Sequence, residues 1–207
     1  MTLIVWRSPV LAADTASFRD EFICRRDTKK IIRTKTGHLV GAAGLTSWCD
    51  RFLAWAIDGF PEHTTPPPTD KDHEEDFIGL VVRPDGRVLE YGPDMLTTEV
   101  TGEPFVVLGT AQEFASALGT LGWSAVEIVK HVIKHHAFVA GDVYSLTLDG
   151  RAQLIDGETA EPKVVTQEDA DIDVDVDAPA FEGYSPATRR MQDTAEDRQF
   201  LDDRGLG

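Results

Sequence analysis

The sequence predicts a single α+β domain in which strands are grouped apart from helices. Three observations lead to this prediction. The chain has 207 residues, which suits one domain with an extension. Its hydrophobic fraction of 42% is sufficient for a packed core. The expected elements run in the order two hairpins, helix, hairpin, strand, two helices and strand, which differs from the alternation of a βαβ fold.

Short apolar runs bounded by turn residues define the expected strands. They lie at residues 2–7, 10–13, 29–33, 39–44, 77–83, 87–91, 105–108 and 142–148. Pro9 separates the first pair and Gly37 lies between the second pair, so each pair is expected to form a hairpin. The Pro84-Asp85-Gly86 turn makes the third hairpin the clearest of the three.

Three stretches have the apolar spacing of helices. They lie at residues 46–57, 112–121 and 124–136. In the first, aromatic residues recur at three- and four-residue intervals, and Thr46 or Ser47 is expected to cap the helix. Gly122 separates the other two. The apolar stripe of each helix predicts a face that packs against the strands.

The net charge of −16 is unevenly distributed along the chain. Residues 152–207 hold 15 of the 36 acidic residues and 5 of the 20 basic ones. From residue 169 to 177, acids alternate with small or β-branched residues, a composition that buries little apolar surface. We therefore expect a folded domain at residues 1–150 and an acidic, largely disordered tail at residues 151–207. The alternative for the acidic run is a strand that pairs with a partner.

Composition also limits the partners and the compartment. The chain has no cluster of Lys and Arg that would bind phosphates, so no nucleic-acid partner is expected. No apolar run reaches the roughly 20 residues that cross a bilayer, and a signal-peptide pattern is missing, so we expect a cytoplasmic protein without a membrane partner. Cys24 and Cys49 lack the paired spacing of a metal or redox motif, which agrees with a reducing compartment.

Two pairs of histidines have to be weighed as metal ligands. His63 and His73 lie among acids in a proline-rich stretch, which we interpret as a solvated loop. His131 and His135 are four residues apart on an expected helix, a spacing that can bind a metal. Because no third ligand lies near them in sequence, we interpret this pair as part of a polar helix face.

The start of the chain offers a candidate nucleophile. If Met1 is removed, Thr2 becomes the N-terminus and carries both a hydroxyl and a free α-amine. An unperturbed α-amine has a pKa of about 7.7 to 8.0, so it can accept the hydroxyl proton near neutral pH. An internal threonine has no such base of its own. The catalytic hypothesis therefore depends on the loss of Met1.

Four landmarks in order make the chain resemble proteasome β-subunits and the bacterial HslV peptidase. They are Thr2-Leu3-Ile4-Val5 with Ala12-Ala13-Asp14, then Lys29-Lys30-Ile31, then Gly41-Ala42-Ala43-Gly44, and later Gly109-Thr110-Ala111. The resemblance covers about residues 2–148. It implies a four-layer αββα sandwich of the N-terminal-nucleophile hydrolase type, assembled into rings that enclose a proteolytic chamber.

The resemblance implies roles for specific residues. Thr2 would attack the peptide carbonyl and form an acyl-enzyme, and Lys30 would favour the unprotonated amine. Asp14 would hold Lys30 in place, and the backbone N–H of Gly41 would stabilise the oxyanion, an interaction worth roughly a hundredfold in rate. The resulting activity would be that of a threonine-type endopeptidase subunit without a cofactor, acting on unfolded polypeptide.

Two further positions and one partner follow from the same resemblance. Family members commonly carry Gly-Ser-Gly where this chain has Gly109-Thr110-Ala111, so Thr110 keeps a hydroxyl on a bulkier residue. Asp142, in Ala140-Gly141-Asp142, resembles a position in HslV near backbone carbonyls that can hold a monovalent cation; whether this chain binds a metal is left open. An ATP-driven unfoldase ring is implied as a partner by analogy with HslV only.

Two other functions stay open from the sequence. The same fold could carry an amidase that acts on a small-molecule amide, or an inactive ring that serves as a scaffold. Oligomeric state distinguishes the peptidase chamber, which needs a ring, from the small-molecule amidase. A free Thr2 amine distinguishes an active enzyme from the inactive scaffold.

Overall fold

The computed structural model describes residues 2–19, 22–60, 77–157 and 162–163. They all belong to the first of two units into which the chain divides, residues 1–172. His63, His73 and the acidic run at residues 169–177 lie outside the described residues. The predictions for those segments therefore stay predictions.

One sheet contains six antiparallel strands in the order β10-β1-β2-β11-β12-β13. Its strands are β1 (Leu3–Arg7), β2 (Val10–Asp14), β10 (Val106–Gly109), β11 (Val143–Thr147), β12 (Ala152–Ile155) and β13 (Pro162–Lys163). Side chains alternate across β1, as the two-residue period of a strand requires. Leu3 and Val5 lie in one hydrophobic cluster, and Ile4 and Trp6 in another.

The second sheet has five antiparallel strands in the order β5-β6-β7-β8-β9. They are β5 (Ile31–Arg33), β6 (Leu39–Gly44), β7 (Phe77–Val82), β8 (Val88–Tyr91) and β9 (Thr97–Val100). The strands β3 (Ser17–Arg19) and β4 (Phe22–Arg25) form a separate two-stranded hairpin.

The described residues form three helices, α1 (Thr46–Ile57), α2 (Gln112–Thr120) and α3 (Ala125–His135). Ser124 and Glu127 make a reciprocal capping box at the start of α3. At the C-terminal end of α2, Arg7 donates to the carbonyl oxygens of Gly119 and Trp123, at 2.9 Å each. The N-cap of α1 is Leu45, and no side chain caps this helix, so the expected cap from Thr46 or Ser47 is absent.

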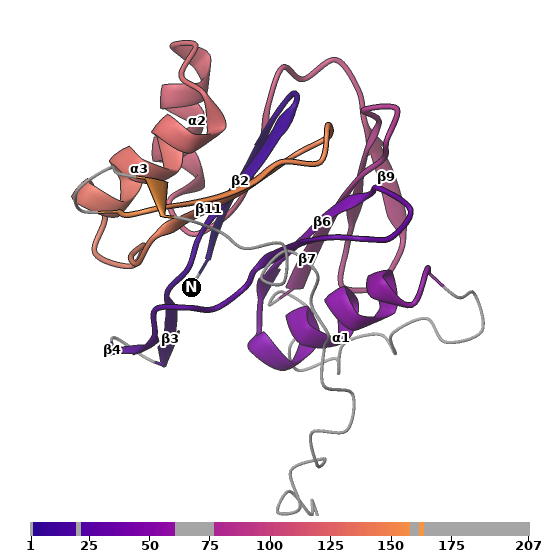
Figure 1. Cartoon of the computed structure of the whole chain (residues 1–207), viewed down its shortest axis with the longest axis horizontal. Coiled ribbons are helices and arrows are strands. Elements are labelled where there is room, and N and C mark those ends of the chain that lie inside the picture. Colours follow the sequence, from indigo (N-terminus) through magenta and orange to yellow (C-terminus); the bar gives the residue numbers. More distant parts are fainter. Residues whose placement is uncertain (1, 20–21, 61–76, 158–161, 164–207) are drawn as a thin grey trace, which may run out of the picture. The chain divides into compact units, whose positions relative to one another are not determined.

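Three hydrophobic clusters separate four layers, in the order helices, sheet, sheet, helix. One cluster lies between α2 and α3 and the six-stranded sheet, the next between the two sheets, and the third between the five-stranded sheet and α1. Figure 1 shows α2 and α3 beside the sheet with β2 and β11, and α1 beside the sheet with β6 and β7. The expected α+β organisation is confirmed.

Five strands were not expected from the sequence: β3, β4, β9, β12 and β13. They are short, and those with described side chains are largely exposed or half-buried, so they lack the apolar pattern that marks a core strand. The domain boundary expected after residue 150 falls between β11 and β12, which pair with each other. The six-stranded sheet therefore continues into the segment assigned to the tail.

Candidate active site

One end of the two sheets collects the segments that the sequence singled out. Thr2 precedes β1, and Asp14 is the last residue of its antiparallel neighbour β2. In the same way, Lys30 precedes β5 and Gly44 ends the neighbouring β6. Antiparallel pairing places the start of one strand beside the end of the next, so these residues gather although they are far apart in sequence.

A buried ion pair forms the centre of this end. Lys30 Nζ donates to both carboxylate oxygens of Asp14 at 2.9 Å, and the Asp14 side chain is 0% and the Lys30 side chain 5% exposed. The backbone N–H of Leu3 also donates to Asp14 Oδ1, at 2.8 Å. Asp14 thus fixes both Lys30 and the peptide unit that joins Thr2 to Leu3.

Burial shifts the pKa of both partners toward the neutral form. Desolvation raises the pKa of the Asp14 carboxyl above its usual 3.8, and the attraction of Lys30 opposes the rise. Desolvation likewise lowers the pKa of the Lys30 ammonium, against the attraction of Asp14. A buried pair stays ionised when its geometry is good and further hydrogen bonds satisfy its remaining polar atoms. Lys30 and Asp14 meet this condition through their two-oxygen contact and the bond from Leu3.

Thr2 is buried and held by its main chain. Its carbonyl oxygen accepts a hydrogen bond of 2.7 Å from the N–H of Thr110. The approach is so close at Gly109 that an added Cβ would lie 2.1 Å from that carbonyl oxygen, and Gly109 has a φ of +91°. Only glycine fits there without displacing Thr2.

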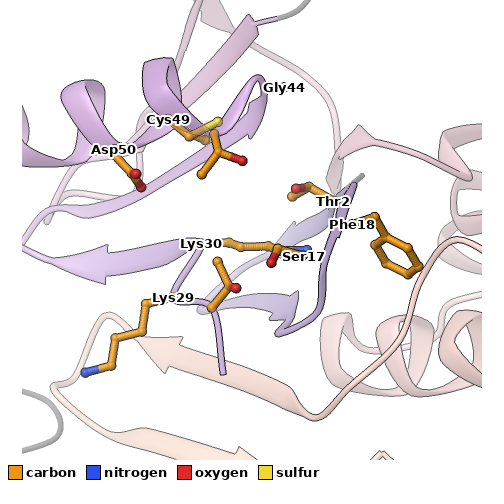
Figure 2. Close-up of a pocket in the computed structure, with 11 residues that line it drawn as sticks. Thr2, Ser17, Phe18, Lys29, Lys30, Gly44, Cys49 and Asp50 are labelled. Carbon is orange, nitrogen blue, oxygen red and sulfur yellow. The ribbon is translucent and has the colours of Figure 1, made fainter. Parts of the chain in front are cut away.

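A pocket opens beside this threonine, lined by Thr2, Lys30 and residues of β6 and α1. Figure 2 shows the Lys30 side chain extending toward Thr2 and Ser17, while Lys29 points away from them. Gly44 and Thr46 line the pocket where β6 ends and α1 begins.

Gly41 does not line this pocket. It lies inside β6, in register with Ile31 on one side and Leu80 on the other. An added Cβ on Gly41 would stand 3.1 Å from the side chains of Ile4 and Ile31, so this position faces the packed space between the sheets. Gly44, three residues on, is the glycine that borders the pocket.

Thr110 and Asp142 lie beside the site rather than in the pocket lining. Thr110 contributes its backbone N–H to Thr2. Asp142 is bonded through its backbone to Thr15, with its carbonyl oxygen accepting from the Thr15 N–H at 3.1 Å. That carbonyl is therefore already engaged by a protein N–H.

Other pocket residues were not found from the sequence as site residues. Ser17, Thr28 and Thr46 add hydroxyl groups, and the buried Thr28 hydroxyl has no hydrogen-bond partner among the described residues. Asp50 lines the pocket from α1, and desolvation raises its pKa. Ser17 and Thr28 come from irregular or weakly patterned segments, so no periodic signal could have marked them.

Cys49 also lines the pocket, but its thiol is a poor nucleophile. Burial, followed by the charge of Asp50, raises its pKa to about 12. The thiolate is therefore scarce at neutral pH. In this environment Cys49 serves as a small, largely apolar side chain.

Among the residues that the structure describes, no three His, Cys, Asp or Glu side chains gather in a way that could hold a metal ion. The rings of His131 and His135 contact each other at a tilt of 44°, with their centroids 4.3 Å apart. None of the described helices is both long and apolar enough to span a membrane.

The arrangement of strands and helices matches solved structures. Eukaryotic HslV from Trypanosoma brucei matches with a TM-score of 0.52 and 16% sequence identity, over 70% of this chain and 98% of HslV. The chain shares its fold with HslV. BPH from Thiobacillus denitrificans, solved in complex with epoxomicin, matches with a TM-score of 0.52 and 13% identity, over 70% of this chain and 96% of BPH. No protein-family model and no curated protein sequence matches the chain.

Proposed function

We propose that the chain is a threonine-type N-terminal-nucleophile peptidase that becomes active when Met1 is removed. One observation carries the proposal. Thr2 shares a pocket with Lys30, whose charge is held by the buried Asp14, and Asp14 also binds the N–H next to Thr2. The fold that the chain shares with HslV supports the same proposed function.

In this proposal the free α-amine of Thr2 is the general base. It accepts the proton of the Thr2 hydroxyl while the oxygen attacks the carbonyl carbon of the scissile peptide bond. The positive charge of Lys30 lowers the pKa of the nearby amine and so increases its unprotonated fraction. Asp14 keeps Lys30 charged and directed into the pocket.

The tetrahedral intermediate then collapses to an ester on Thr2. The protonated amine of Thr2 donates its proton to the leaving nitrogen, so the C–N bond breaks and an amine product departs. Water, activated by the same amine, attacks the ester and releases the acid product. Thr2 is regenerated with its hydroxyl and its amine.

We propose Gly44, rather than Gly41, as the donor to the oxyanion. Its support is that Gly44 borders the pocket, whereas Gly41 packs between the sheets. The α1 helix begins at Thr46 in the pocket wall and has no side-chain cap, so the partial positive charge of its first turn is available to an anion. Such donors are typically worth about a hundredfold in rate.

Thr110 and Asp142 take supporting parts in the proposal. The N–H of Thr110 positions the Thr2 carbonyl, and the backbone of Asp142 positions the segment after Asp14. An unfolded polypeptide as substrate, a ring of identical subunits, a cytoplasmic location and an unfoldase partner are further parts of the proposal. They rest on the resemblance to HslV and proteasome β-subunits.

Intact mass and a covalent probe test the proposal together. Purified protein should be lighter than the full sequence by one methionine residue. The processed protein should then gain the mass of one epoxomicin, the compound bound by BPH, because an epoxyketone reacts with an N-terminal threonine that has a free amine. It should also hydrolyse a fluorogenic peptide.

The variants Thr2→Ala and Lys30→Met should abolish both the adduct and peptide hydrolysis. Thr98→Ala, at an exposed threonine of β9, is the matched control and should keep both. Retention of Met1 would refute the catalytic proposal. A processed protein without an adduct or turnover would support the scaffold alternative, and a monomer by light scattering would exclude the ring.

A further inference from the structure

Thr15 follows Asp14 directly and uses every polar group it has. Its side chain is buried, with the residue 4% exposed. Its backbone N–H, its carbonyl and both functions of its hydroxyl are all hydrogen-bonded within the protein. A buried polar network in which every group is paired is rigid, so it can hold the segments that it joins in one arrangement.

The first set of bonds leads to the segment that carries Lys30. The Thr15 hydroxyl donates to the carbonyl oxygen of Arg26 at 2.6 Å. The Thr15 carbonyl accepts from the N–H of Thr28 at 2.9 Å. Two residues after Thr28, the carbonyl oxygen of Lys30 accepts a hydrogen bond of 3.2 Å from the N–H of Ala42 in β6. Thr15 therefore supplies two bonds that fix residues 26–28 just before Lys30.

The second set leads to the loop before β11. The N–H of Asp142 donates to the Thr15 hydroxyl at 2.8 Å, and the Thr15 N–H donates to the Asp142 carbonyl. Gly141 lies so close that an added Cβ would stand 2.6 Å from the hydroxyl oxygen, and its φ is +88°. The N–H of Ala16 also donates to the carbonyl oxygen of the neighbouring Ala140 at 3.1 Å, and Val143, which follows this loop, pairs with Asp14.

We propose that Thr15 is a positioning residue for the catalytic centre. Its single hydroxyl links the segment before Lys30 to the loop that supports Asp14, and so it sets the distance between the two charged groups. The inference rests on the proposed function, because Thr15 acts only through Lys30 and Asp14. It extends that function to a residue that lies outside the pocket.

The valine variant isolates the hydroxyl. Thr15→Val keeps the shape, but a methyl group can neither donate to Arg26 nor accept from Asp142, and it cannot approach a carbonyl oxygen to 2.6 Å. Thr15→Ser keeps both bonds. Thr34→Val is the matched control, since Thr34 is also 4% exposed and its hydroxyl also accepts a backbone N–H, from His38, in the turn between β5 and β6.

Kinetics on the processed full chain give the first readout. In Thr15→Val we expect kcat for a fluorogenic peptide to fall by about 10- to 100-fold, with KM changed less than about twofold, since misplacement near 1 Å costs this much. Thr15→Ser should restore kcat, and Thr34→Val should leave it unchanged even if both valine variants melt at similarly lower temperatures. Equal kcat in the two valine variants would overturn the proposal.

The titration of Lys30 gives a readout that does not need activity. With lysine labelled at 13Cε in the full chain, the Lys30 signal is assigned by its loss in Lys30→Met. In Thr15→Val, water should reach the ion pair and raise the pKa of Lys30 toward its ordinary value, with no change in Thr15→Ser or Thr34→Val. If neither the unchanged protein nor any variant hydrolyses the peptide, the proposed function fails. Independently of that result, an unchanged pKa of Lys30 in Thr15→Val would refute the positioning role.

Discussion

Replacement of Lys30 by methionine should be the most damaging single change to the ion pair at the site. The substitution leaves a carboxylate that is 0% exposed without its two hydrogen bonds of 2.9 Å. Removing one partner of a buried pair costs about 3 to 5 kcal/mol in the free energy of unfolding. An exposed pair, such as Arg87 with Asp85, contributes much less, because solvent screens the two charges.

The measurement is a double-mutant cycle in urea at one protein concentration. It compares Lys30→Met, Asp14→Asn and the double variant, with Arg87→Met as the control that removes an equally short but exposed ion pair. The double variant should be more stable than the sum of the two single losses predicts, by about 2 kcal/mol. Additive losses, or equal losses in Lys30→Met and Arg87→Met, would refute the reasoning.

The loss in Lys30→Met should depend on pH in a defined direction. Burial raises the pKa of Asp14 above 3.8 even in the intact pair, and removal of Lys30 takes away the attraction that opposes the rise. An acid with a raised pKa in the folded state favours folding at low pH and loses that contribution as pH rises through the folded pKa. The deficit should therefore be largest at neutral pH and shrink as pH falls toward 3.8.

Three further predictions concern capping, packing and thiol reactivity. Ser124→Ala removes the capping box of α3 and should lower the free energy of unfolding by about 1 kcal/mol in urea titrations. Gly79→Ala places a Cβ 2.6 Å from the ring of Phe52 and should cost about 1 to 3 kcal/mol, which Phe52→Leu should partly relieve in the double variant. A thiol reagent at pH 8 should modify one cysteine of the native protein, the exposed Cys24, because the pKa of Cys49 is raised to about 12.

Each of these has a control in the same chain. Ser47→Ala, in the first turn of a helix without a side-chain cap, should leave the free energy of unfolding nearly unchanged. If Phe52→Leu does not reduce the cost of Gly79→Ala, the ring is not the source of the strain. A thiol that reacts in native Cys24→Ser, where Cys49 is the remaining cysteine, would contradict the burial of Cys49. In urea, both thiols of the unchanged protein should react.

Part of the candidate site follows from residue type and order. Thr2 and Asp14 lie at adjacent strand ends of one expected hairpin, whereas Lys30, in the second hairpin, was assigned to the same site only through the resemblance to proteasome β-subunits and HslV. Gly41 illustrates the limit, because four small residues in a row look alike in sequence. Which of them borders the pocket depends on where β6 ends and α1 begins.

The strands of the core were predictable for a similar reason. Their side chains alternate between two buried clusters, so periodicity is present in the letters. Strands such as β9 and β12 have no such pattern, because their side chains are largely exposed or half-buried. The positions of these strands in the sheets are set by backbone hydrogen bonds to neighbouring strands. Residue type alone predicts such pairing poorly, because strand preference depends on context.

The amino-acid sequence by itself determined the α+β class and the principal strands and helices. The candidate roles of Thr2, Asp14 and Lys30 are those that the resemblance to proteasome β-subunits and HslV implies. Only the tertiary structure decided that Gly44 borders the pocket and that α1 begins there uncapped. It also decided that Thr15 joins two loops, through a bond to a residue 127 positions away. Local patterns are set by neighbours along the chain, whereas a contact at that separation exists only after the distant strands β2 and β11 have paired.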